Sequence, residues 1–108
     1  MIIEDNIKVA RLLDVYGSLL TDKQHKIMSF YYFDNLTLSE IADNLNITRQ
    51  AVNDCLTQAT NSLENYEKEL CILKKHDNLK LRINNMLKKS TNEDLNNKLQ
   101  EILEMLDE

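Results

Sequence analysis

"LSEIADNLNITRQAVND", residues 38–54, has the spacing of a helix-turn-helix. Ala42 supplies the small residue needed where two helices cross, and Asn46 stands at the turn, where the backbone must adopt unusual angles. The pattern therefore predicts one helix over 38–45 and a second helix that begins after Thr48. The residues expected to face the shared core of this motif are Ile41, Ala42, Leu45, Ile47, Val52 and Cys55.

Two further helices are predicted before this motif. The first covers about residues 5–16, with Asp5 as its N-cap and Gly17, the single glycine, ending it in a left-handed conformation. The second begins after Thr21, where Gln24 stands at the spacing of a capping box. The segment "IMSFYYF" (27–33) lies in this helix, and we assign it to the core rather than to base stacking.

The helix after Thr48 is predicted to be long, because apolar residues recur along it at alternating spacings of four and three. The expected dimer or packing seam consists of Leu56, Leu63, Tyr66, Leu70 and Leu73. The pattern is interrupted at 74–78 by a stutter or a short loop. We therefore expect a helix-turn-helix domain over 1–73 and a helical extension over 74–108 that packs on the same core or on a partner. Ser90 and Glu93 predict a capping box before a last amphipathic helix.

Composition agrees with an all-α, helix-turn-helix bundle. The 108 residues include one Gly and no Pro, whereas an all-β fold needs many turn residues. The sequence has no apolar run long enough to span a membrane, and we expect a cytoplasmic protein without membrane insertion. Cys55 and Cys71 lie sixteen positions apart, about 24 Å along one helix, so we expect two reduced thiols.

The distribution of charge does not favour the simplest interpretation of the motif, which is that it binds DNA. Residues 38–67 contain one basic residue, Arg49, against five acidic residues. Residues 74–89 contain six basic residues against one acidic residue. Because neutralised phosphates supply most non-specific affinity for DNA, we expect the helix-turn-helix to act mainly as a scaffold. The residues predicted to contact nucleic acid are Arg49, Gln50, Asn53, Thr57, Lys74, Lys75, Lys80 and Arg82.

Two interpretations of the basic segment 74–89 remain open at this point. It forms a solvated surface neutralised by the acidic residues of 91–108, or it contacts phosphates. In the second case a structured RNA suits it better than a DNA groove, because double-stranded RNA is recognised mainly by shape and backbone. In both interpretations, the positive charge lies outside the motif that resembles a DNA reader.

The sequence resembles the YlxM-type helix-turn-helix proteins of Gram-positive bacteria and mollicutes, which are themselves similar to the fourth region of sigma factors. The resemblance covers about residues 10–73 and rests on "LLDVYGSLLTDKQ" (12–24), "YYFDNLTLSEIADNLNITRQAVND" (31–54) and "LENYEKEL" (63–70). It implies a small all-helical cytosolic protein, a homodimer, that assists protein targeting. The partners it implies are the signal recognition particle GTPase Ffh and the particle's RNA.

From these observations we expect a non-enzymatic adaptor or regulator of the signal recognition particle pathway. The alternative is a sequence-specific DNA-binding transcription regulator that reads base edges through Arg49, Gln50 and Asn53. No catalytic residues, cofactor or metal site are predicted, since a glycine-rich phosphate loop is missing and His25 and His76 lack the spacing of metal ligands.

Overall fold

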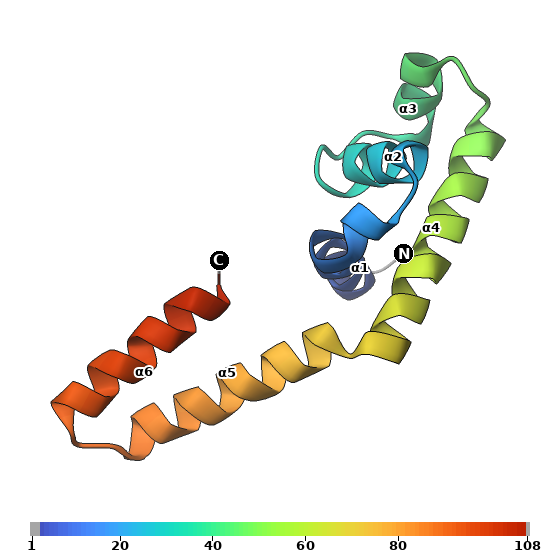
Figure 1. Ribbon diagram of the computed structural model, residues 1–108. Coiled ribbons are helices and arrows are strands. Elements are labelled where there is room, and N and C mark those ends of the chain that lie inside the picture. The colour runs from blue at the N-terminus through green and yellow to red at the C-terminus, as the bar shows by residue number, and fades with distance from the viewer. Residues whose placement is uncertain (1–2, 108) are drawn as a thin grey trace. The chain divides into compact units, whose positions relative to one another are not determined.

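The computed structural model describes residues 3–107, with side chains from residue 6 onward. This part of the chain is all-helical, as the sequence predicts (Figure 1). It forms two compact units that divide between Leu70 and Cys71. The elements are α1 (Ile3–Tyr16), the 3-10 turn η1 (Gly17–Leu19), α2 (Asp22–Tyr32), α3 (Leu38–Leu45), α4 (Arg49–Leu70), α5 (Ile72–Lys89) and α6 (Glu93–Leu106).

Side-chain caps determine where the helices of the first unit begin. The Gln24 N–H donates to the Thr21 hydroxyl at 3.2 Å, and the Thr21 N–H donates back to the Gln24 side chain. Thr37 and Glu40 form the same reciprocal pair at the start of α3. Each cap satisfies backbone donors that have no partner inside the helix, typically about 1 kcal/mol per cap. The capping boxes predicted for α2 and α3 are therefore confirmed.

The start of α1 differs from the sequence prediction. The helix already includes Ile3, so Asp5 lies within it and is not its N-cap. The side chain of Asp5 lies outside the described residues.

Gly17 serves close packing rather than a left-handed turn, and the prediction of a left-handed conformation is wrong. No glycine in the described chain has a positive φ, and Gly17 opens η1. A Cβ built there would lie 3.1 Å from Cδ2 of His25 and 3.2 Å from Cδ1 of Leu13. The His25 ring thus lies against the backbone at the end of α1, where an added Cβ would make tight contacts with His25 and Leu13.

One apolar stripe on α4 is the contact surface for α1, α2 and α3 (Figure 1). Its buried members recur at helical spacing and are Val52, Leu56, Ala59 and Leu63. The residues that cover it are Val9, Leu12, Leu13 and Tyr16 of α1, Ile27 and Met28 of α2, and Ile41 and Ala42 of α3. The Tyr16 hydroxyl also donates to Oε1 of Glu67 at 2.6 Å. The first unit is therefore built on α4.

The predicted seam does not form one continuous face for a second copy. Leu56 and Leu63 are buried within the first unit, which leaves them inaccessible to another chain. Tyr66 is half-buried and lies beside Tyr16, with 6.0 Å between the ring centroids. Leu70 is 47% exposed at the end of α4, and Leu73 belongs to the next helix. Most of this stripe is internal packing.

The long helix ends earlier than the sequence suggests. Cys71 adopts φ 56° and ψ 30°, in the left-handed region, and separates α4 from α5. The segment 74–78, where a break was expected, lies inside α5. The apolar spacing continues through Leu70 and Leu73, and neither Gly nor Pro marks the break, so periodicity alone placed it too late.

The second unit is a hairpin of α5 and α6 with a small core of its own. Ile83, Leu99 and Leu103 are buried, and Leu87 and Leu106 pack against them. Nζ of Lys80 contacts Oδ1 of Asp107 at 2.6 Å near one end of the hairpin, where a ring nitrogen of His76 also contacts the backbone oxygen of Leu106.

The predicted capping box at the start of α6 is wrong. Asn92 caps this helix by accepting from the Leu95 N–H at 3.1 Å. The Ser90 hydroxyl instead accepts from the Asn92 N–H, which fixes the loop between the two helices.

We predict that Cys71→Gly raises the free energy of unfolding. A side chain in the left-handed region costs about 1–2 kcal/mol, and glycine avoids this cost, so a gain of about 1 kcal/mol is expected after the entropy lost by glycine. Thermal unfolding followed by circular dichroism measures the effect. Cys71→Val, which places a β-branched residue there, should lower the midpoint. Equal midpoints for the two variants would contradict the assigned backbone.

Gly17→Ala is expected to destabilise the first unit by about 1 kcal/mol, because the new methyl group overpacks the contact with His25 and Leu13. In a His25→Ala background the same change should cost less, since one of the two colliding side chains is gone. A double-mutant cycle by urea unfolding measures this coupling. Additive effects of the two substitutions would show that His25 does not constrain Gly17.

Candidate nucleic-acid interface

The helix-turn-helix has the geometry that the sequence predicts. Asn46 adopts φ 57° and ψ 46°, and its N–H bonds back to Ala42 and Asp43 carbonyls at the end of α3. The Ala51 N–H donates to the Thr48 hydroxyl at 3.0 Å and so caps α4. Six residues were expected to face the shared core: Ile41, Ala42 and Val52 are buried, and Leu45, Ile47 and Cys55 are half-buried.

The Cys55 thiol is a packing group rather than a reactive one. Burial raises the pKa of this thiol, and nearby Lys23 lowers it by a smaller amount. A raised pKa keeps the sulfur protonated near neutral pH, where only the thiolate is a good nucleophile. Neither Cys55 nor Cys71 forms a disulfide within the described residues, and both are half-buried.

The outward face of α4 exposes the residues predicted to read bases, but several are already engaged. Nε2 of Gln50 donates to Oδ1 of Asp54 at 2.8 Å. The Thr57 hydroxyl donates to the Asn53 backbone oxygen at 3.0 Å, as threonines in helices often do. Arg49 is exposed at the start of the helix. A carboxylate on the groove-facing surface repels phosphates, so this helix presents hydrogen-bonding groups with little attraction for a polyanion.

A groove beside α4 was not predicted from the sequence. It has a volume of about 450 Å³, and its lining includes Tyr31, Tyr32, Asn53 and Thr57. The two tyrosine rings stack with their centroids 5.0 Å apart. Burial is the main cause that raises the pKa of Tyr32. The aromatic segment was assigned to the core as a whole, so nothing in the sequence indicated that Tyr31 and Tyr32 line a groove.

Only part of that aromatic segment is in fact core. Ile27 and Met28 are fully buried, whereas Tyr31 and Tyr32 are half-buried and Phe33 is 46% exposed. The assignment of 27–33 to the core is therefore correct for the start of the segment and wrong for its end.

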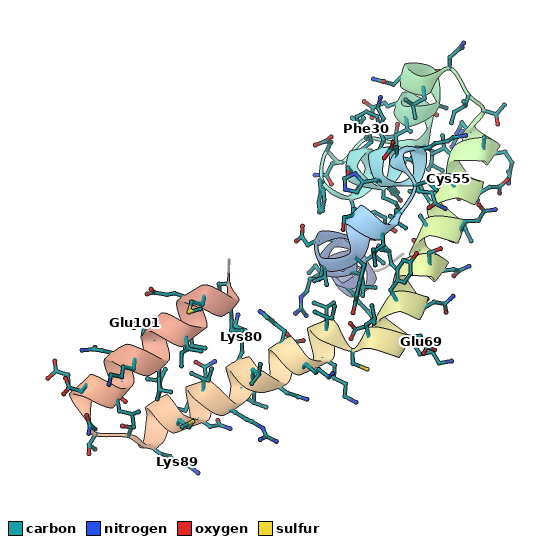
Figure 2. The ribbon with its side chains drawn as sticks, in the orientation of Figure 1. Phe30, Cys55, Glu69, Lys80, Lys89 and Glu101 are labelled. Atoms are coloured by element: carbon teal, nitrogen blue, oxygen red, sulfur yellow. The ribbon has the colours of Figure 1, made fainter. Side chains whose placement is uncertain are left out.

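A second candidate surface is the side of α5 that points away from α6. At about 100° per residue, its basic residues fall within an arc of roughly 140° centred opposite the buried Ile83. We call this surface the basic face, and it consists of Lys74, Lys75, Arg82, Lys88 and Lys89. All five are exposed, and Figure 2 shows Lys89 directed away from α6. Basic residues that are separated along the sequence therefore lie on one side of α5.

Lys80 does not belong to this surface, although the sequence grouped it with Lys74, Lys75 and Arg82. It lies on the side of α5 that faces α6 and pairs there with Asp107. The interpretation of 74–89 as charge neutralised by the last helix therefore fits Lys80. It does not fit the basic face, because α6 packs on the opposite side of α5.

The described helices include none with the length and hydropathy of a membrane span. Among the same residues, no group of three or more His, Cys, Asp or Glu side chains is placed to hold a metal ion.

Comparison with known proteins agrees with the geometry of the first unit. The family model described as "Putative helix-turn-helix protein, YlxM / p13 like" matches residues 3–104. A UPF0122 protein of Caldanaerobacter subterraneus subsp. tengcongensis is 44% identical over 80 residues, which cover 74% of this chain and 68% of that protein. A UPF0122 protein of Lacticaseibacillus casei is 49% identical over 70 residues, which cover 65% of this chain and 62% of that protein. The chain therefore belongs to the YlxM/p13-like helix-turn-helix family, UPF0122.

Proposed function

We propose that the protein is a non-enzymatic adaptor or regulator of the signal recognition particle pathway, and that it binds a structured RNA through the basic face of α5. The observation that supports this proposal is that the exposed positive charge lies on α5 and not on the helix-turn-helix. Five exposed cations lie on one side of α5, whereas the outward face of α4 has Arg49 against Asp54. The resemblance to the YlxM family supplies the pathway and the two partners, the particle's RNA and its GTPase.

The physical argument concerns phosphates. Binding of lysine or arginine to a phosphate releases condensed counterions, and this release supplies most of the affinity that does not depend on sequence. Lys75, Arg82 and Lys89 recur every seven residues, about 10 Å apart along the axis, and so form a straight row of cations. A row without base-reading groups suits a partner that is recognised by backbone and shape, as double-stranded RNA is.

The helix-turn-helix acts in this proposal as the scaffold that carries the second unit. Its groove-facing residues remain available for a protein surface, and the GTPase is the partner that the family suggests. In the alternative function, a transcription regulator, Arg49 and Asn53 read base edges in the major groove. The exposure of both side chains is the observation in its favour.

The first prediction from this proposal concerns cations. Lys75→Gln combined with Lys88→Gln should weaken binding to targeting-particle RNA and reduce the slope of log K against log[salt] by about 1.5 to 2. Fluorescence anisotropy between about 50 and 200 mM salt measures both quantities. The matched control is Lys23→Gln combined with Lys26→Gln, which removes the same charge from α2. Equal losses in the two double variants would mean that net charge, rather than the basic face, determines affinity.

The second prediction separates the two functions. Arg49→Ala should leave RNA binding within about twofold, since a single exposed arginine on this face makes at most one phosphate contact that the proposal does not need. A panel of the RNA and random duplex DNA, with and without the GTPase, measures the preference. Preferred binding to one duplex DNA sequence, lost in Arg49→Ala and kept in the α5 variant, would replace the adaptor by the transcription regulator. Absence of any complex with RNA or GTPase at low salt would also overturn the adaptor.

A further inference from the structure

Exposed apolar side chains lie along one side of the α5–α6 hairpin. On α5, Leu79 and Met86 are 50% and 51% exposed, and on α6, Leu95 and Ile102 are 41% and 44% exposed. We call these four residues the apolar strip. Exposed apolar surface of this kind marks interaction sites. The hairpin also has a small core, and a unit of fewer than about 40 residues usually needs further burial to be stable.

Helix geometry places both halves of the apolar strip on the same side of the hairpin. At about 100° per residue, its α5 members lie about 40–60° from the direction of Ile83, which faces α6. Its α6 members lie about 40–60° from the direction of Leu99, in the same rotational sense. Because the two helices run antiparallel (Figure 1), equal senses of rotation bring the two pairs to one surface.

The strip consists of two layers. A ring nitrogen of His76 contacts the backbone oxygen of Leu106, and this contact sets the level of α6 against α5. Counted from it, Ile102 is level with Leu79 to within one residue, and Leu95 is level with Met86 to within one residue. The two layers are therefore about 10 Å apart along the hairpin, which is the repeat of two helical turns.

Positive charge flanks the apolar strip on both sides. The cations beside it are Lys75, Arg82 and Lys89 on α5 and Lys98 on α6, and all four are exposed. They lie about 80–120° from the core direction of their own helix, in the same rotational sense as the strip. By the count above, Lys98 is level with Arg82 to within two residues, so these two cations lie on opposite sides of the strip. Within the described residues, the ion pairs of the hairpin involve other side chains.

The carboxylates of the hairpin point away from the strip. Asp94 and Glu101 lie about 140–160° from the core direction of α6, beyond Lys98. The remaining carboxylates of residues 72–107 fall on the opposite surface of the hairpin, and they are Asp77, Glu93, Glu104 and Asp107. The surface that carries the strip is therefore apolar along its middle and basic along both edges.

This pattern selects one kind of occupant. A helix laid along the line between α5 and α6 contacts both halves of the strip, and its own flanking side chains come beside the four cations. A flat anionic lipid surface fits less well, because the cations project further from the hairpin than the apolar side chains, and charge would enter the hydrocarbon first. A second copy that presented the same surface would bring four cations against four, and these would repel.

We propose that the apolar strip binds an amphipathic helix of a partner protein, whose apolar residues recur at helical spacing between two acidic edges. The bound helix completes a three-helix bundle with α5 and α6. Its carboxylates on one edge pair with Lys75, Arg82 and Lys89, and those on the other edge pair with Lys98. This contact does not depend on the proposed RNA contact.

The test uses a fluorescein-labelled peptide of three heptads, with leucine at the first and fourth positions of each heptad and glutamate at the fifth and seventh. The control peptide has lysine in place of every glutamate. Fluorescence anisotropy with the full chain at low salt measures both dissociation constants. The expected result is micromolar binding of the glutamate peptide and binding at least about tenfold weaker for the lysine peptide, because like charges meet across the contact.

Apolar variants locate the contact. Ile102→Gln should raise the dissociation constant of the glutamate peptide about tenfold or more, because it removes a central apolar contact. The matched control is Leu81→Gln, since Leu81 is 60% exposed on the outer side of α5, and this variant should bind as the parent chain does. Circular dichroism checks that both variants keep their helices.

Charge variants separate this contact from the RNA contact. Lys98→Gln should weaken peptide binding about two- to fivefold and leave RNA binding unchanged, because Lys98 lies outside the basic face. Lys88→Gln, which removes a cation of the basic face on the side away from the strip, should do the reverse. The RNA proposal can therefore fail while the peptide contact stands, and the peptide contact can fail while the RNA proposal stands.

Three results with the peptides would overturn the inference: no binding of the glutamate peptide, equal binding of the two peptides, or binding that survives Ile102→Gln. Adsorption of the chain to phosphatidylglycerol vesicles, lost in Ile102→Gln, would assign the strip to a lipid surface instead. Self-association in analytical ultracentrifugation, lost in the same variant, would assign the strip to a second copy.

Discussion

The first unit depends on one apolar stripe of α4, which contacts α1, α2 and α3. Val52, Leu56, Ala59 and Leu63 face inward at once against α1, α2 and α3. This burial fixes the rotation of α4 and therefore determines which side chains point outward. The outward set contains Arg49 and Asp54 but little other positive charge. Packing thus explains both why the helix-turn-helix forms and which residues of α4 remain exposed.

Some features decided by local chemistry were predictable from the sequence, although the caps expected at Asp5 and Ser90 were wrong, and features decided by packing between helices were not predicted. The caps at Thr21 and Thr37 involve residues three positions apart, and both were identified. The role of Gly17 was predicted wrongly, because the group that favours a small residue there is the His25 ring, eight residues further along the chain. The break at Cys71 was missed because the left-handed residue is a cysteine, and neither glycine nor proline indicates a break at this position.

The candidate sites show the same difference between what the sequence indicates and what only the packing determines. Which residues are basic was known from the sequence, but only the fold separates Lys80, which pairs with Asp107, from the five cations on the outer side of α5.

The most direct measurement of the central claim is the map of amide chemical shifts in the full chain on addition of targeting-particle RNA at low salt. The account predicts that the largest changes cluster along α5 around Lys75, Arg82 and Lys88, while Arg49 to Thr57 of α4 change little. Changes concentrated at the start of α4, with α5 unaffected, would contradict the account. They would indicate that the helix-turn-helix itself binds the nucleic acid.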